Sequence, residues 1–122
     1  MPKTICVIDD ELDVLEEIRA WLGEYGYRVV TASRADEGLE KIRDYNPDLI
    51  LLDIGMPEKD GFELLSELKN NRRTSSIPVL MLTAKSESSA ILKAQSMKAS
   101  DYITKPFKNQ ELLKLIRRYE GL

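Results

Sequence analysis

The sequence contains no histidine and only one cysteine among its 122 residues. Without histidine, the chain cannot itself carry a phosphohistidine, use an imidazole as a base or bind a metal through imidazole. The single cysteine, Cys6, excludes an intramolecular disulfide and is typical of a reducing compartment, so we expect a cytoplasmic protein. Cys6 lies inside an apolar run, which favours a buried and inert thiol over a nucleophile.

Long apolar runs and an excess of basic residues are also missing. No segment approaches the ~20 apolar residues of a membrane-spanning helix, and the N-terminus lacks the pattern of a signal peptide. The formal net charge of -3 argues against direct binding of nucleic acid, which needs a basic face. With 43% hydrophobic and 32% charged residues, the composition is that of a globular protein, and the length predicts one domain over residues 1–122.

Five apolar runs alternate with five helical patterns along the chain. We expect strands over residues 4–9, 27–32, 49–53, 78–82 and 101–104. We expect helices over residues 11–25, 34–45, 62–70, 87–97 and 109–119, with Ser33 as the N-cap of the second helix. The alternation predicts an α/β fold of the flavodoxin-like (βα)5 type, a doubly wound sandwich whose five parallel strands lie in the order 2-1-3-4-5.

Polar residues follow four of these strands. Asp9 and Asp10 come after the first, and Asp53, Thr83 and Lys105 end or follow the third, fourth and fifth. Because the carboxyl ends of parallel strands share one edge, these groups should meet in the crevice where open α/β sheets bind ligands. Taken singly, each acid has an ordinary alternative: a helix N-cap for Asp10, and a solvated surface position for the other two.

Three carboxylates in one crevice require a compensating cation. Two like charges ~4 Å apart repel by ~4 kcal/mol at an effective dielectric of 20. Lys105 can neutralise one charge, and the remaining oxygen ligands favour Mg²⁺, with Mn²⁺ also suitable. Asp53 is the candidate nucleophile, since a carboxylate can form an acyl phosphate, while Thr83 and Lys105 can contact phosphoryl oxygens.

Four segments together resemble the receiver domain of two-component response regulators over essentially the whole chain. They are VIDDE (7–11), DLILLDIGMPEKDG (48–61), PVLMLTA (78–84) and DYITKPF (101–107). The resemblance implies that Asp53 is the phosphoacceptor in a phosphorelay. The donor would be the phosphohistidine of a histidine kinase or of a histidine phosphotransfer protein. Such a protein is a signalling switch, not an enzyme: it catalyses only its own phosphotransfer and autodephosphorylation.

The resemblance also assigns individual roles. Asp10, Asp53 and the backbone carbonyl of Gly55 would ligate Mg²⁺, with Asp9 acting directly or through water. Thr83 and Lys105 would bind the phosphoryl group, with a cis peptide bond between Lys105 and Pro106. Thr83 and Tyr102 would form the switch. Movement of both would repack the surface of the fourth helix, fifth strand and fifth helix, where an effector or a second copy would bind.

Three positions depart from the common receiver pattern. Gly55 and Lys85 flank the crevice and are expected to influence how long the phosphoryl group survives. Lys98 stands where many receivers have glycine. Because a lysine in a left-handed position at a helix end is mildly strained, we expect the end of the fourth helix to be remodelled or mobile.

Several alternatives stay open. The chain could be an interaction module that binds partners without phosphorylation. A haloacid-dehalogenase-type phosphatase is disfavoured because its Asp-x-Asp spacing is missing, and a flavin-binding flavodoxin because Asp9 and Asp10 would repel a phosphate. An apolar cluster on the fifth helix is either core or a partner surface. It comprises Leu112, Leu113, Leu115 and Ile116.

Overall fold

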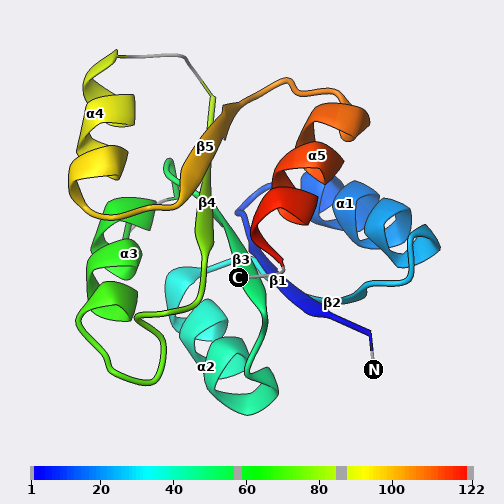
Figure 1. Ribbon diagram of the computed structural model, residues 1–122, viewed down its shortest axis with the longest axis horizontal. Coiled ribbons are helices and arrows are strands. Elements are labelled where there is room, and N and C mark those ends of the chain that lie inside the picture. The colour runs from blue at the N-terminus through cyan, green and yellow to red at the C-terminus, as the bar shows by residue number, and fades with distance from the viewer. Residues whose placement is uncertain (1, 57–58, 85–87, 121–122) are drawn as a thin grey trace.

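A computed structural model of the chain describes residues 2–56, 59–84 and 88–120 and contains one five-stranded parallel sheet (Figure 1). The strand order is β2-β1-β3-β4-β5, as predicted. The strands are β1 (Thr4–Ile8), β2 (Arg28–Ala32), β3 (Leu49–Asp53), β4 (Val79–Thr83) and β5 (Asp101–Thr104). The helices are α1 (Leu12–Glu24), α2 (Ala35–Tyr45), α3 (Gly61–Lys69), α4 (Ser88–Ser96) and α5 (Asn109–Tyr119).

The sheet is covered on both faces. Helices α1 and α5 lie on one side of it, and α2, α3 and α4 lie on the other (Figure 1). Strands β3 and β4 are buried along their whole length, so their side chains alternate between two apolar clusters. Ile50 and Leu52 belong to the cluster under α2, α3 and α4, whereas Leu49 and Leu51 belong to the cluster under α1 and α5. This double burial explains why both strands read as continuous apolar runs.

The predicted strand and helix bounds agree with the structure to within one residue at most ends, but one cap is wrong. Arg34, not Ser33, is the N-cap of α2 and makes no side-chain capping bond. Ser33 instead donates its backbone N–H to Oε1 of Glu37, at 2.6 Å. The carboxylate of Glu37 therefore reaches back to the start of the helix and satisfies the backbone there.

Helix α4 keeps the left-handed end, with the strain that a lysine has there, and is not remodelled. Lys98 has a φ of 68°, in the left-handed region that disfavours residues with a side chain. Its backbone N–H donates to the carbonyl of Gln95, and that of Ala99 donates to the carbonyl of Ala94. The left-handed residue thus lets the chain turn from α4 towards β5. Lys85, another position that departs from the common receiver pattern, lies outside the described residues.

The apolar cluster of α5 is mainly core. Leu112 and Ile116 are fully buried and Leu113 is almost so, while Leu115 packs partly buried against the same cluster. In the monomer these side chains therefore contribute to folding, and the helix does not offer them as a free docking surface.

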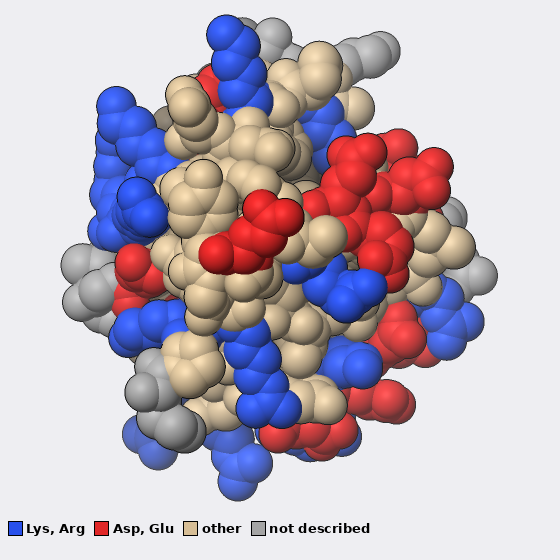
Figure 2. All heavy atoms as spheres, turned by 90° about the vertical axis from the view of Figure 1, so that its right-hand side faces the viewer, with Lys and Arg blue, Asp and Glu red and all other residues tan. Residues whose placement is uncertain are grey.

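The outer face formed by α1 and α5 carries charges of both signs. Figure 2 shows acidic side chains gathered on one side of this face, with basic and uncharged side chains over the rest. The sequence explains this division, because α1 has four acidic residues and one arginine, whereas α5 has one glutamate, one lysine and two arginines. This face is mixed in charge and not uniformly basic.

Candidate functional site

The ends of three adjacent strands are tied together by backbone hydrogen bonds just beyond the sheet. The N–H of Ile54 donates to the carbonyl of Leu82 at 2.9 Å, and the N–H of Lys105 donates to the carbonyl of Thr83 at 2.6 Å. These bonds continue the register in which Asp53 lies opposite Leu82. The residues that leave β3, β4 and β5 are therefore held at one edge of the sheet.

Three carboxylates converge at this edge, as the sequence predicts. Asp9, Asp10 and Asp53 each place one carboxylate oxygen within 4.8 Å of the others. Asp9 is completely buried and Asp53 is 5% exposed, whereas Asp10 is open to solvent. The ordinary alternatives for these acids fail: Asp9 and Asp53 are not solvated, and the N-cap of α1 is Glu11, not Asp10.

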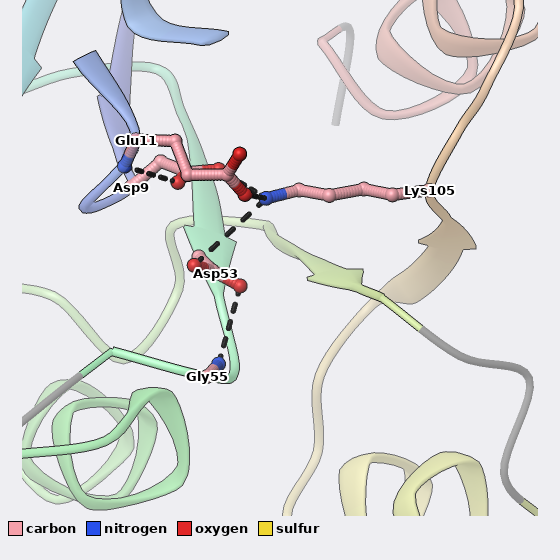
Figure 3. Close-up of polar contacts among 5 residues, drawn as sticks. All are labelled: Asp9, Glu11, Asp53, Gly55 and Lys105. Carbon is pink, nitrogen blue, oxygen red and sulfur yellow. Dashed lines mark hydrogen bonds and ion pairs between the residues drawn. The ribbon is translucent and has the colours of Figure 1, made fainter. Parts of the chain in front are cut away.

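Lys105 supplies a positive charge to this cluster. Figure 3 shows its side chain reaching from the end of β5 across to the acids that follow β1. Its Nζ lies 2.6 Å from Oδ2 of Asp9, 3.3 Å from Oε1 of Glu11 and 3.9 Å from Oδ2 of Asp53. Burial lowers the pKa of Lys105, but the hydrogen bond to Asp9 and the nearby negative charges outweigh it, so the pKa lies above its ordinary value. The ammonium stays charged.

Asp53 is held in an environment that disfavours its charge. Burial and then the negative charge of Asp9 raise the pKa of Asp53 to about 7, although the Gly55 N–H and the charge of Lys105 act in the opposite direction. The Gly55 N–H donates to Oδ1 of Asp53 at 3.1 Å, which orients the carboxylate. A cation bound beside Asp53 would favour its ionised form.

Gly61, the first residue of α3, makes room for Asp53. A Cβ at Gly61 would lie 2.3 Å from the backbone oxygen of Asp53 and 2.8 Å from the Cα of Ile54. Both neighbours are backbone atoms, so they cannot move aside as the tip of a side chain does. Asp60 caps the helix by accepting the N–H of Glu63 at 2.9 Å. Only glycine therefore lets α3 begin directly against the end of β3, and sequence reasoning placed this residue merely in a turn.

The residues present fit a divalent cation. The cluster offers carboxylate oxygens only, which suits Mg²⁺ or Mn²⁺ better than softer metals. When Asp53 is ionised the cluster carries three negative charges, and the one ammonium of Lys105 is shared with Glu11, so the site holds excess negative charge that a divalent ion would offset. Gly55 has no side chain to obstruct the site, and a Cβ there would approach Oδ1 of Asp53 no closer than 3.9 Å.

This arrangement agrees with a comparison of the chain with known protein families. The model of the response regulator receiver domain matches residues 5–117. The chain belongs to this family. Receivers act in phosphorelay signalling by response regulators, as signalling switches and not as conventional enzymes.

Curated relatives place the receiver within longer regulators. The phosphate regulon transcriptional regulatory protein PhoB of Pseudomonas aeruginosa is 41% identical over 122 residues, which is 98% of this chain and 53% of that protein. The alkaline phosphatase synthesis transcriptional regulatory protein PhoP of Bacillus subtilis is 39% identical over 92% of this chain and 46% of that protein. The receiver thus spans about half the length of the curated relatives it matches.

Solved receivers share the fold. A putative response regulator from Chloroflexus aurantiacus superposes with a TM-score of 0.94 at 32% identity, with both chains covered completely. The BeF3-activated N-terminal receiver domain of RstA from Klebsiella pneumoniae superposes with a TM-score of 0.90 at 32% identity, over 98% of this chain and all of that one. The predicted flavodoxin-like fold is therefore confirmed.

The structure also describes the other residues that the resemblance singles out. The Lys105–Pro106 bond is cis, as predicted. Thr83 is the last residue of β4 and is buried at 6% exposure. Tyr102, in β5, is partly buried and packs against the cluster under α4. Their roles in phosphoryl binding and switching stay predictions.

Sequence reasoning gave no role to Glu11 or to the groove beside it. Glu11 contacts Lys105, and it also borders a groove of about 640 Å³ between α1 and the connection from β5 to α5. Val14, Trp21 and Phe107 contribute apolar surface to this groove. The only sequence signal for Glu11 is its place directly after Asp9 and Asp10. Among the helices in the described ranges of the receiver, none is long and apolar enough to span a membrane.

Proposed function

We propose that this receiver, residues 1–122 acting as one domain, accepts a phosphoryl group on Asp53 from a phosphohistidine. The donor is a histidine kinase or a histidine phosphotransfer protein. The observation that carries the proposal is the position of the Asp53 carboxylate: almost buried, beside Asp9 and Asp10, and 3.9 Å from the Lys105 ammonium. The chain has no histidine, so the phosphohistidine belongs to the partner.

The transfer exchanges one bond to phosphorus for another. An Oδ atom of ionised Asp53 attacks the phosphorus, and the bond between phosphorus and the donor imidazole nitrogen breaks. The imidazole leaves with that electron pair and takes up a proton from solvent, while Asp53 becomes an acyl phosphate. Lys105 meets the incoming phosphoryl oxygens with an ammonium that is already charged, and the Thr83 hydroxyl donates to another of these oxygens.

Mg²⁺ is the cofactor we expect, with Mn²⁺ as a substitute. Asp10, Asp53 and the backbone carbonyl of Gly55 would hold it, with Asp9 as a direct or water-mediated ligand. When bound, the ion supplies positive charge that favours ionised Asp53 and offsets the charge of the phosphoryl oxygens.

The output follows from the charge that arrives at Asp53. About two negative charges are added, and Thr83 and Lys105 move to meet them. The space that Thr83 leaves is filled by the ring of Tyr102, which repacks the surface of α4, β5 and α5. A downstream effector or a second copy binds this surface. Shifting the equilibrium from 1:99 to 99:1 takes ~5.5 kcal/mol of differential interaction.

Intact-mass measurement tests the chemistry. Incubation with Mg²⁺ and acetyl phosphate should add one phosphate to the wild type and none to Asp53→Asn, and a chelator should abolish the gain. Asp44→Asn is a matched control, because Asp44 is an exposed residue of α2 and should be phosphorylated like the wild type.

The same measurement separates this proposal from the alternative. A wild type that gains no phosphate while it still binds a protein partner would favour an interaction module that works without phosphorylation. A gain that persists in Asp53→Asn would place the phosphoryl group on another residue and would also contradict the proposal.

A further inference from the structure

Glu11 shares the ammonium that the phosphoryl group needs. Its Oε1 lies 3.3 Å from Nζ of Lys105, closer than the 3.9 Å that separates this nitrogen from Asp53 (Figure 3). We propose that Glu11 is a positioning residue that holds Lys105 in its resting place and must release it when Asp53 is phosphorylated. This inference rests on the proposed function, because it concerns the same phosphoryl site.

Of the two acids that contact Lys105 most closely, Glu11 is the one whose side chain can move away. Asp9 is completely buried, and its two oxygens are engaged by Lys105 and by the backbone N–H of Glu11. The side chain of Glu11, in contrast, is 61% exposed, while that of Lys105 is only 15% exposed. Glu11 can therefore turn out into water at little cost, whereas Asp9 cannot leave without exposing the buried site.

The backbone of Glu11 stays fixed when its side chain moves. Its N–H donates to Oδ1 of Asp9 at 2.9 Å, and its carbonyl accepts the N–H of Leu15 at 3.1 Å. Glu11 is also the N-cap of α1, but its side chain makes no capping hydrogen bond. Neutralising the side chain thus removes the ion pair with Lys105 without removing a cap, which makes the charge of this contact testable by substitution.

The charge of Glu11 opposes phosphorylation in two ways. It draws the Lys105 ammonium away from Asp53, and it adds a fourth carboxylate to a site that must admit a dianionic phosphoryl group. Both effects favour the unphosphorylated arrangement. Glu11 therefore slows loading of Asp53 and helps Lys105 return to Asp9 after the phosphoryl group is lost.

Glu11→Gln should speed phosphorylation by acetyl phosphate and tighten binding of beryllofluoride, a phosphoryl analogue. A partly exposed ion pair contributes up to ~1 kcal/mol, so we expect roughly two- to five-fold changes in both quantities. The rate is followed by intact mass in Mg²⁺, and the affinity by calorimetric titration. A residue with a merely structural role would not improve either quantity.

Two further variants distinguish the contact from general charge. Glu17→Gln removes the same charge from an exposed position of α1 that makes no contact with Lys105 among the described residues, and it should behave like the wild type. Glu11→Asp keeps the charge but shortens the side chain by one methylene, so it should lose the contact while it keeps the repulsion. Its rate and affinity should therefore lie between those of the wild type and Glu11→Gln.

These experiments distinguish a failure of the role of Glu11 from a failure of the proposed function. If the wild type gains no phosphate, the proposed function fails. If the wild type is phosphorylated and Glu11→Gln is no faster than Glu17→Gln, the role of Glu11 is wrong. If Glu11→Asp instead matches the wild type, the effect comes from charge alone, and the restraint on Lys105 is refuted.

Discussion

At the scale of single residues, Asp53 shows how position changes the chemistry of a carboxylate. The sequence identifies an aspartate at the end of a strand, but its raised pKa comes from burial and from Asp9, a residue 44 positions away. A carboxyl group that is easily protonated makes a poor nucleophile near neutral pH. The same group beside a divalent cation is ionised, so the site couples the reactivity of Asp53 to metal binding.

This coupling predicts a pH-dependent stability. In the absence of Mg²⁺, Asp53 binds more protons in the folded state than in the unfolded state between pH ~4 and ~7, so its contribution to the free energy of unfolding falls as pH rises through that window. Asp53→Asn removes this titration. The stability of the variant relative to the wild type should therefore increase from pH 4 to pH 8, by on the order of 2–4 kcal/mol.

Urea unfolding across this pH range, with chelator present, measures the difference. Adding Mg²⁺ at pH 8 should stabilise the wild type, because the ion binds the folded state, and should stabilise Asp53→Asn much less. Parallel pH profiles for the two proteins would contradict the raised pKa of Asp53.

Gly61 carries a second prediction at this scale. Gly61→Ala forces a Cβ against the backbone of Asp53 and Ile54, so it should lower the free energy of unfolding by about 1–3 kcal/mol and slow phosphorylation of the displaced Asp53. Gly23→Ala is the matched control. A Cβ at Gly23 meets nothing within 4 Å, and alanine favours the helix by roughly 0.5–1 kcal/mol. Equal stability changes for both variants would refute the close-approach argument.

At the scale of elements, α4 combines a regular helix with a strained end. Its Ala94 is buried in the core, whereas Leu92 is 63% exposed. Lys98 then adopts a left-handed conformation for which its side chain is unsuited. Because α4 forms part of the proposed output surface, strain at its end affects how readily that surface repacks.

Lys98→Gly should relieve this strain. The left-handed conformation costs roughly 1–2 kcal/mol for a residue with a side chain, and glycine loses roughly 0.5–1 kcal/mol through unfolded-state entropy, so a net gain of about 0.5–1 kcal/mol is expected. Asn46→Gly provides the comparison, since Asn46 is also left-handed, with a φ of 47°, but asparagine tolerates this region. Thermal unfolding should show the larger gain for Lys98→Gly; a loss of stability would contradict it.

At the scale of the whole molecule, the parallel sheet creates the site. Every strand enters at one edge and leaves at the other, so residues 9, 53, 83 and 105 reach the same edge although the chain between them forms helices. Loops at that edge can vary without disturbing the clusters on either face of the sheet. The fold thus supplies a rigid frame, and the residues beyond the strand ends supply the chemistry.

Most of this frame is predictable from the sequence because it follows from periodicity. The continuous apolar runs of β3 and β4 require burial on both faces, and alternation with helices then restricts the strand order. Ser33 shows where local reasoning fails. Serine is a favoured N-cap, but here the carboxylate of Glu37 satisfies the backbone and the helix begins later. The N-cap propensity of Ser33 was therefore outweighed by the side chain of Glu37, which lies one helical turn later.

The sequence by itself determined the chemical groups of the site and the sheet edge at which they meet, because strand direction follows from pattern and connection. Only the tertiary structure decided that Lys105 bridges Asp9 and Glu11 more closely than it approaches Asp53, and that α3 begins against the backbone of Asp53 at Gly61. Those facts depend on separations of a few ångströms between elements that are distant in the chain. No periodicity encodes such separations, because they arise from how all the elements pack at once.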